Sequence, residues 1–203
     1  FAILEKLSGA GADLSELGVP FSDPMADGPA VQASSMRALE SGMTVVRLFD
    51  LVRRFRKVDS TTPLVLVVYY TPIHAYGTAR FAKDAADAGV DGLITVDLPP
   101  EEDEVLRAPA SAHGLNVIRL ATPTTDEHRL KVVLKDASGY LYYVAIAGVT
   151  GTKGFSPDDV RAALARLKAH TDLPIAVGFG IKTPEQAGAI AQIADAAVVG
   201  SSI

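Results

Sequence analysis

Short apolar runs alternate with longer amphipathic stretches along the whole chain, and this alternation limits the possible folds more than any other feature. Several runs are rich in Val, Ile and Tyr and almost continuously apolar, which is typical of parallel strands buried on both faces. The predicted strands are 14–19, 63–70, 92–96, 116–120, 140–146, 174–178 and 196–200. Such strands in alternation with helices indicate an α/β protein with a parallel sheet.

The stretches between these strands carry the signals of helices. Pro157 and Pro184 follow Ser156 and Thr183, which are good N-cap residues, and proline is favoured in a first helical turn. Helices are predicted over residues 1–10, 43–58, 79–88, 101–112, 128–135, 157–169 and 184–193.

A weak internal repeat marks the passage from helix to strand. Small residues end a helix and an aspartate then opens the next strand, at 9–13, 88–92 and 193–196. Repeated β/α units need such exits. Seven strands and about eight helices in alternation predict a (β/α)8 TIM barrel that lacks its first strand and its last helix. An open doubly wound sheet is the alternative, but no glycine-rich dinucleotide motif follows any strand.

Composition and charge exclude several classes of function. The 203 residues, 48% apolar and 21% charged, are typical of a soluble globular protein, and no linker divides the predicted single domain, 1–203. A net charge of −5 argues against a nucleic-acid partner. No apolar stretch reaches the ~18 residues of a membrane span, and no signal peptide is visible. A cytoplasmic location without membrane contact is therefore expected.

Metal and thiol chemistry are also unsupported. The chain has no cysteine, which excludes disulfides, thiolate metal sites and cysteine nucleophiles. The four histidines are scattered, and no two have the spacing of metal ligands. No metal site is predicted.

The segment 16–29, ELGVPFSDPMADGP, concentrates carboxylates in an apolar setting. Glu16 lies within a run that predicts a buried strand, where an unpaired carboxylate is costly and its pKa rises. Glu16 is therefore a candidate acid–base residue. Asp23 and Asp27 follow in a Pro- and Gly-rich loop, where turn formation is the alternative explanation for each of them.

The late strands end in glycine-rich turns, at 147–151, 178–181 and 200–202. In a TIM barrel, phosphate is commonly held by the last βα loops, where glycines let backbone N–H groups approach an oxyanion. Three such turns in succession favour a phosphate site over ordinary tight turns. The hydroxyl of Ser201 could add a donor, and Phe179 could cover an aromatic ligand or pack in the core.

Tyrosines follow two of the strands. Strand periodicity places Tyr142 and Tyr143 on opposite faces, and an inward Tyr142 would lie near Glu16. One of Tyr69 and Tyr70 should line the same barrel mouth.

Together these residues resemble the tryptophan synthase alpha subunit family. The resemblance rests on 16–29 and is reinforced by 69–73, 97–101, 121–125, 142–151, 178–181 and 200–201. It covers essentially the whole chain and implies a TIM barrel that cleaves indole-3-glycerol phosphate to indole and glyceraldehyde 3-phosphate. It also implies an α2β2 assembly in which indole passes to a beta subunit. Pyridoxal phosphate is expected on that partner, and no cofactor is expected on this chain.

The resemblance implies a role for each matching residue. Glu16 would be the general acid–base residue, Asp27 the carboxylate that pairs with the indole N–H, and Tyr142 a neighbour of Glu16. The phosphate would be held by Gly151, Gly180, Gly200 and Ser201. The substrate or the closing loop would be contacted by Phe179, Val67, Ile94 and Thr150. Pro20 and Asp23 would lie towards the beta subunit.

Other functions stay open at this point. Another phosphate-binding barrel, such as a phosphosugar isomerase or indole-glycerol-phosphate synthase, would share the late loops without the pair Glu16 and Asp27. An alpha-like subunit that only regulates a beta partner is the alternative from another class. The sequence departs from the family pattern at Ser15, Thr71 and the segment 145–147, and the last of these keeps the regulatory alternative open.

Overall fold

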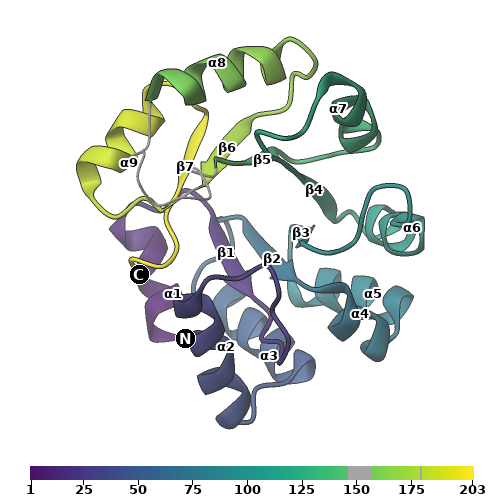
Figure 1. Cartoon of the computed structure of the whole chain (residues 1–203). Coiled ribbons are helices and arrows are strands. Elements are labelled where there is room, and N and C mark those ends of the chain that lie inside the picture. Colours follow the sequence, from purple (N-terminus) through teal and green to yellow (C-terminus); the bar gives the residue numbers. More distant parts are fainter. Residues whose placement is uncertain (146–156, 179) are drawn as a thin grey trace. The chain divides into compact units, whose positions relative to one another are not determined.

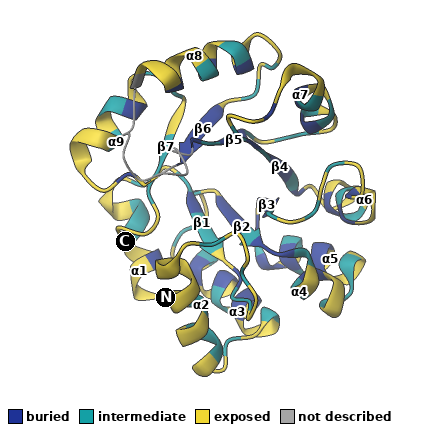
Figure 2. Ribbon diagram, in the orientation of Figure 1, coloured by how far each residue is buried: buried dark blue, intermediate teal, exposed yellow. Residues whose placement is uncertain are grey.

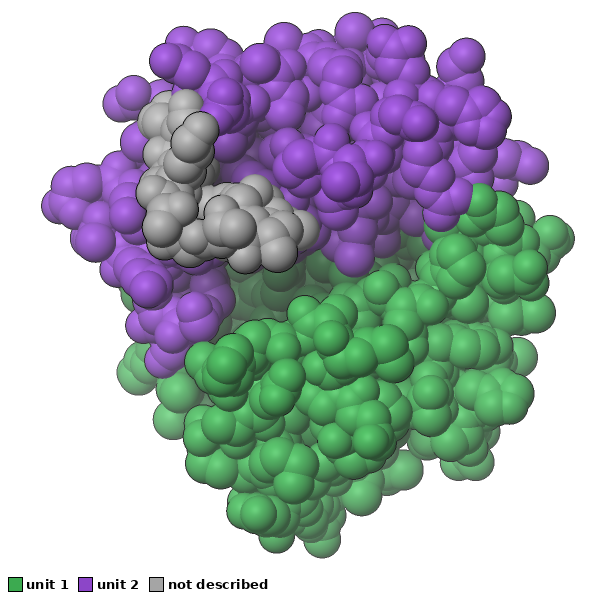
Figure 3. Space-filling model, viewed as in Figure 1, with its two compact units in different colours: residues 1–117 green, residues 118–203 purple. Residues whose placement is uncertain are grey.

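The computed structural model describes residues 1–145, 157–178 and 180–203. These residues form two compact units, Phe1–Val117 and Ile118–Ile203, coloured green and purple in Figure 3. Strand β4 (Asn116–Ala121) contains the boundary between them. Within each unit, parallel strands alternate with helices as the sequence predicts (Figure 1). The prediction of a single domain over 1–203 stays a prediction.

Unit 1 is built on three parallel strands in chain order, with helices between them. The strands are β1 (Ser15–Gly18), β2 (Leu64–Val68) and β3 (Gly92–Thr95). The helices are α1 (Ala2–Leu7), the 3-10 turn η1 (Ser8–Ala10), α2 (Pro29–Glu40), α3 (Val45–Arg56), α4 (Tyr70–Tyr76), α5 (Thr78–Ala88) and α6 (Glu104–Ala112).

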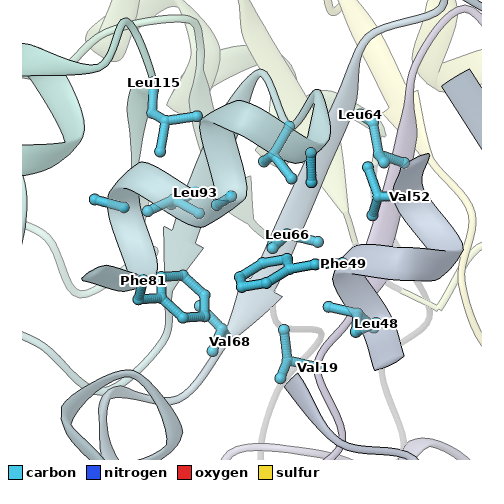
Figure 4. Packing of buried hydrophobic residues seen from close by; sticks show 14 of the residues in the cluster. Val19, Leu48, Phe49, Val52, Leu64, Leu66, Val68, Phe81, Leu93 and Leu115 are labelled. Atoms are coloured by element: carbon cyan, nitrogen blue, oxygen red, sulfur yellow. The ribbon is translucent and has the colours of Figure 1, made fainter. Parts of the chain in front are cut away.

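One face of this sheet packs against α3 and α5 and forms the hydrophobic core of unit 1 (Figure 4). Phe49 of α3 and Phe81 of α5 lie over the sheet with their ring centroids 5.3 Å apart. The alternate strand residues that meet these helices are Leu64, Leu66, Val68 and Leu93. Figure 2 shows β2 largely as buried, and burial of this apolar surface is the main stabilising contribution.

The opposite face of the sheet carries a different set of side chains. Register pairs Glu16 with Val65, and Gly18 with Val67, which in turn pairs with Ile94. Paired residues of neighbouring parallel strands point to the same side, and residues two apart along a strand share a face. Glu16, Val67 and Ile94 therefore share the face that does not pack against α3 and α5.

Two of the three repeated aspartates predicted from sequence, Asp91 and Asp195, have the same structural role. The side chain of Asp91 accepts from the backbone N–H of Leu64 at 2.7 Å, while the Asp91 N–H donates to the Leu64 carbonyl. Asp195 makes the same reciprocal pair with Ile175 in unit 2. Each aspartate thus connects the beginning of its own strand to the first residue of the preceding strand by two hydrogen bonds. A basic residue supports each pair: Arg56 contacts Asp91 and Lys168 contacts Asp195.

Unit 2 continues the same pattern. Its parallel strands are β4, β5 (Leu141–Val144), β6 (Ile175–Gly178) and β7 (Ala196–Val198), and its helices are α7 (Glu127–Leu134), α8 (Pro157–Lys168) and α9 (Pro184–Ala191). Its core is formed by alternate strand residues and the inner faces of the helices, including Leu130, Leu141, Tyr143, Leu164, Leu167, Ile175 and Val177. Thr183 caps α9 as predicted, whereas Ser156 lies outside the described residues.

Two helices differ from the sequence predictions. Helix α2 was not predicted, and none of its residues is buried, so it lacks the apolar stripe on which helix prediction depends. Helix α4 replaces the end of the predicted strand 63–70. Its first backbone N–H, at Tyr70, donates to the Asp97 side chain at 2.7 Å, which satisfies a donor at the helix start.

The remaining elements match their predictions to within a few residues at each end. Strand 140–146 is observed as Leu141–Val144, with residue 146 outside the described part. Helix 101–112 begins only at Glu104, after the turn at Pro99 and Pro100. Among the described residues, no helix has both the length and the apolarity needed to cross a bilayer.

Candidate active site

The face of the unit 1 sheet that lies opposite α3 and α5 holds three of the predicted site residues. Glu16 and Val67 are half-buried, and Ile94 is only 1% exposed. Their common face follows from the register of β1, β2 and β3. A carboxylate therefore lies on the same face of the sheet as two aliphatic side chains.

The strand that carries Glu16 is less buried than predicted. Ser15 is buried, Glu16 and Leu17 are half-buried, and Gly18 is exposed. Among the described residues β1 pairs only with β2, so its other edge has no strand neighbour to cover it. The prediction of a fully buried strand was wrong for this reason.

Asp27 ends a turn in the loop that leaves β1. Its backbone N–H donates to the carbonyl of Pro24 at 3.1 Å, which closes the turn, and its own carbonyl accepts from the Gln32 side chain of α2. Its side chain is half-buried, and this burial raises the pKa of Asp27 above its usual value. A hydrogen bond from the hydroxyl of Tyr69 acts in the opposite direction on the same pKa.

Tyr69 is the tyrosine that reaches this loop. It follows β2, is 4% exposed, and its hydroxyl accepts the N–H of Ala26 at 2.9 Å. Its ring lies 5.4 Å from that of Phe21. The sequence predicted that either Tyr69 or Tyr70 would line the mouth of the barrel. The backbone turns from β2 into α4 between these two residues. Tyr69 therefore lies against the loop after β1, whereas the hydroxyl of Tyr70 bonds to Thr78.

The residues predicted to face a partner lie in the same loop. Pro20 is half-buried and Asp23 is exposed, with its carboxylate bonded to the Ser22 hydroxyl. Met25 beside them is 78% exposed, and Val31 and Met36 of α2 are exposed as well. This part of unit 1 therefore presents apolar side chains to its surroundings.

Tyr142 in unit 2 is placed by a glycine of the neighbouring strand. Leu141 and Tyr143 point into the core, and Tyr142 points to the opposite face, as strand periodicity predicts. A Cβ atom at Gly178 would lie 1.9 Å from the Tyr142 hydroxyl oxygen. The phenol thus occupies the space that any side chain at Gly178 would need, and the sequence prediction missed this function of Gly178.

The turns after β6 and β7 lie side by side in unit 2. The hydroxyl of Ser202 donates to the Ile181 carbonyl at 3.1 Å, which joins the two turns. Gly180 has a φ of +54°, a conformation that glycine adopts without strain, and Gly200 and Ser201 are exposed nearby in sequence. The structure therefore joins the segments of three predicted phosphate-binding residues.

The other predicted residues of unit 2 lie outside the described part of the chain. These are Thr150, Gly151 and Phe179, together with the glycine-rich turn 147–151. Ala145 is described: it is buried and extends the ladder of β5 by donating to the Gly178 carbonyl. Within the described ranges, no cluster of histidine and carboxylate side chains has the arrangement of a metal site.

Comparisons with known proteins agree with one another. The family model described as tryptophan synthase alpha chain matches residues 1–203. A tryptophan synthase alpha chain from Gluconacetobacter diazotrophicus is 59% identical over 202 residues, which cover 100% of this chain and 74% of that protein. The solved alpha subunit from Legionella pneumophila strain Paris is 43% identical with a TM-score of 0.91, and the match covers 99% of this chain and 74% of that one.

A second solved structure extends the agreement. It is described as the tryptophan synthase α2β2 complex of Pyrococcus furiosus and matches at 37% identity with a TM-score of 0.88, over 99% of this chain and 82% of that one. These neighbours are TIM barrels, so the predicted (β/α)8 fold class is confirmed. This chain belongs to the tryptophan synthase alpha chain family.

Proposed function

We propose that this chain cleaves indole-3-glycerol phosphate to indole and glyceraldehyde 3-phosphate, with Glu16 and Asp27 as its catalytic residues. The family catalyses this carbon–carbon lyase reaction in tryptophan biosynthesis. The observation that carries the assignment is the placement of Glu16 on the sheet face away from the core, followed along the chain by the Asp27 loop.

Glu16 supplies and then removes protons. Cleavage of the bond at C3 of the indole ring requires protonation of C3, which gives a cationic indolenine. Glu16 donates that proton as a general acid. The ionised carboxylate then takes the proton from the side-chain hydroxyl as the aldehyde forms. One residue thus serves both steps, and the proton balance closes.

Asp27 stabilises the charge that develops between these steps. Protonation of C3 spreads positive charge to the ring nitrogen, and a carboxylate at the indole N–H favours that state. Such an interaction contributes most where water is excluded, and Asp27 is half-buried. Asp27 must be ionised for this role; burial raises its pKa, and the cationic indolenine formed beside it favours the ionised carboxylate.

The phosphate is held by the late loops. Gly180, Gly200 and Ser201 lie in or beside the joined turns after β6 and β7, where backbone N–H groups and a hydroxyl bind an oxyanion well. Gly151 completes this set. The phosphate is remote from the bond that breaks, so its binding energy serves to position the reacting carbon.

The aromatic ring is held by apolar side chains. Val67 and Ile94 share a face with Glu16 and offer the indole an aliphatic surface. Tyr142, Phe179 and Thr150 complete the substrate contacts in this proposal.

The product indole passes to a beta subunit. The similar Pyrococcus furiosus protein is described in an α2β2 complex, and we place the corresponding interface of this chain at Pro20 and Asp23. The exposed Met25 beside them supports that location. Pyridoxal phosphate belongs to the beta subunit in this assembly, this chain carries no cofactor, and the pathway operates in the cytoplasm.

The deciding experiment measures indole release from indole-3-glycerol phosphate, with and without an added beta subunit. Release that rises with the beta subunit and falls at least about 100-fold in Glu16→Gln supports the proposal, because removal of a general acid–base residue costs about that much. Glu5→Gln changes an exposed residue of α1 and serves as the matched control. No release from folded protein, together with activation of the beta subunit, would identify a purely regulatory subunit instead.

A further inference from the structure

We propose that Asp97 is a positioning residue for Asp27. Its carboxylate binds the first N–H of α4, this bond sets the place of Tyr69, and the Tyr69 hydroxyl binds the turn that ends at Asp27. The proposal rests on the proposed function, because Asp27 acts in catalysis only if the chain cleaves indole-3-glycerol phosphate. Asp97 acts through other residues and need not touch the substrate.

Three connections leave the carboxyl ends of neighbouring strands in unit 1. They are the loop after β1 (19–28), the direct passage from β2 into α4, and the loop after β3 (96–103). The N–H of Val19 donates to the Val67 carbonyl at 2.9 Å. The N–H of Val96 likewise donates to the Val68 carbonyl at 3.1 Å. Each ladder therefore continues one residue into its loop, and the loops start from fixed positions at one edge of the sheet.

Asp97 connects the loop after β3 to the beginning of α4. Its carboxylate accepts the N–H of Tyr70, the first residue of that helix, at 2.7 Å. The first N–H groups of a helix have no partner within the helix, and a negative charge beside them is favourable. Tyr69, the residue before, has extended backbone angles, φ −85° and ψ 152°. The bond therefore stabilises the change from strand to helix at this residue.

This change of direction determines which neighbours Tyr69 has. Its side chain is 4% exposed, and its ring centroid lies 5.4 Å from that of Phe21. Its hydroxyl oxygen accepts the N–H of Ala26 at 2.9 Å. Ala26 lies within the turn that the Asp27 N–H closes onto the Pro24 carbonyl. One ring and one hydroxyl thus hold the turn that ends at Asp27.

The position of this turn matters for the reaction, because Asp27 has to meet the indole N–H at one place. Displacement of a reacting group by about 1 Å can cost about a hundredfold in rate. The path from Asp97 to the turn consists of two hydrogen bonds and the backbone between Tyr69 and Tyr70. Loss of either bond should therefore loosen the same turn.

The kinetic test uses the chain assembled with a beta subunit. We expect Asp97→Ala to lower kcat for indole release by about tenfold, with a smaller change in KM, because the proposed phosphate and ring contacts lie on other elements. Asp97→Asn keeps an oxygen that can accept the Tyr70 N–H and should restore most of the rate. Glu102→Ala removes an exposed carboxylate from the same loop and should leave the rate unchanged.

An NMR signal gives a readout that does not depend on activity. In chains labelled with nitrogen-15 alanine, the Ala26 amide is assigned by its loss in Ala26→Ser. Tyr69→Phe should shift this signal, because it removes the acceptor of the Ala26 N–H. Asp97→Ala should shift it in the same direction, whereas Asp97→Asn and Glu102→Ala should leave it in place.

A double-mutant cycle tests whether the two hydrogen bonds act in series. Asp97→Ala and Tyr69→Phe should together lower kcat by less than the product of their separate effects, because each loosens the same turn. Effects that multiply in full would contradict a shared path.

The outcomes separate this inference from the proposed function. An Ala26 signal that is the same in the parent and in folded Asp97→Ala overturns the positioning role, even where the parent chain is active. A loss that Asp97→Asn does not restore overturns the hydrogen bond as its cause. An inactive parent chain overturns the proposed function itself, whatever the spectra show.

A second variant covers the case in which Asp97→Ala fails to fold. The α-hydroxy acid analogue of tyrosine at position 70 keeps the side chain and replaces the N–H that Asp97 accepts by an oxygen atom. It should shift the Ala26 signal as Tyr69→Phe does. An unshifted signal in that folded chain would rule out the proposal.

Discussion

Tyr69 and Tyr70 are adjacent tyrosines of one predicted strand, yet the structure gives them different neighbours. Tyr69 is buried against the Asp27 loop, and Tyr70 opens α4. The sequence predicted that one of the two would matter, because both end an apolar run. It could not choose, since the choice depends on where the backbone leaves β2 for a helix, and that point is set by the contact of Tyr70 with Asp97.

Ser15 is a second residue whose setting suggests an experiment. It is 2% exposed, and its hydroxyl has no hydrogen-bond partner among the residues that the structure describes. A desolvated hydroxyl without a partner costs free energy, so Ser15→Ala should raise the free energy of unfolding by about 1 kcal/mol. Chemical denaturation measures this change, with the exposed Ser60→Ala as the control. A clear loss of stability in Ser15→Ala would show that the hydroxyl is bonded after all.

Gly178 allows a prediction about both stability and activity. A Cβ atom there would lie 2.4 Å from the ring carbon that carries the Tyr142 hydroxyl, so Gly178→Ala must displace the phenol. We expect a loss of about 1–3 kcal/mol of stability, as for other overpacked cores, together with slower indole release. Thermal unfolding and the indole assay measure the two effects.

The control for this prediction is Gly188→Ala in α9. A Cβ atom at Gly188 meets nothing within 4 Å, and alanine is favoured over glycine within helices, so this variant should be neutral or slightly stabilised. Replacement of Tyr142 by Ala should also remove most of the cost of Gly178→Ala, because the clash then has no partner. If Gly178→Ala costs the same stability in the Tyr142→Ala variant, the strain does not come from contact with the Tyr142 ring.

At the scale of elements, the aspartates at strand entries are the clearest structural device. Asp91 and Asp195 each exchange two hydrogen bonds with the first residue of the preceding strand. The sequence repeat predicted an aspartate at these turns but not its partner. The partner follows only from parallel pairing, which brings residues far apart in sequence to the same end of the sheet.

The pKa of Asp195 makes this device testable by pH. The backbone N–H of Ile175 and, to a smaller extent, the Lys168 ammonium lower the pKa of Asp195 in the folded chain. A lowered folded pKa contributes stability above the unfolded value, and that stability is lost as pH falls through the folded value. Asp195→Asn should therefore cost about 1 kcal/mol near pH 7, and the difference from the parent should shrink below about pH 4.

Urea denaturation across this pH range measures the effect. The exposed Asp172→Asn, in the turn before β6, is the control for loss of one negative charge. A difference between Asp195→Asn and the parent that stays constant from pH 7 to pH 3 would mean that the charge of Asp195 contributes nothing.

Helices α2 and α4 show the limit of prediction at this scale. Helix α2 has no buried residue, so hydrophobic spacing gave no sign of it. Helix α4 is short and begins with Tyr70 and Thr71, residue types that also fit the end of a strand. Both helices lie in the segments that connect neighbouring strands, and hydrophobic spacing does not mark where they begin or end.

At the scale of the whole molecule, the chain has the strand–helix order of its family over nearly its full length. Its two compact units each contain part of the predicted site. Unit 1 carries the two carboxylates with Val67 and Ile94, and unit 2 carries Tyr142 and the joined turns after β6 and β7.

The sequence by itself determined the fold class and the family, and it predicted Glu16 and Asp27 as the catalytic carboxylates. Periodicity and turn signals depend on local chemistry, and the segment 16–29 is specific enough to name the family. The tertiary structure decided which residues are in contact. The Tyr69 hydroxyl bonds to the Ala26 N–H, the Tyr142 phenol lies against Gly178, and the Asp195 carboxylate bonds to the Ile175 N–H. Each contact joins residues that are distant along the chain. Such pairs depend on strand register and on the exit angle of each loop, which packing sets only once the sheet has formed.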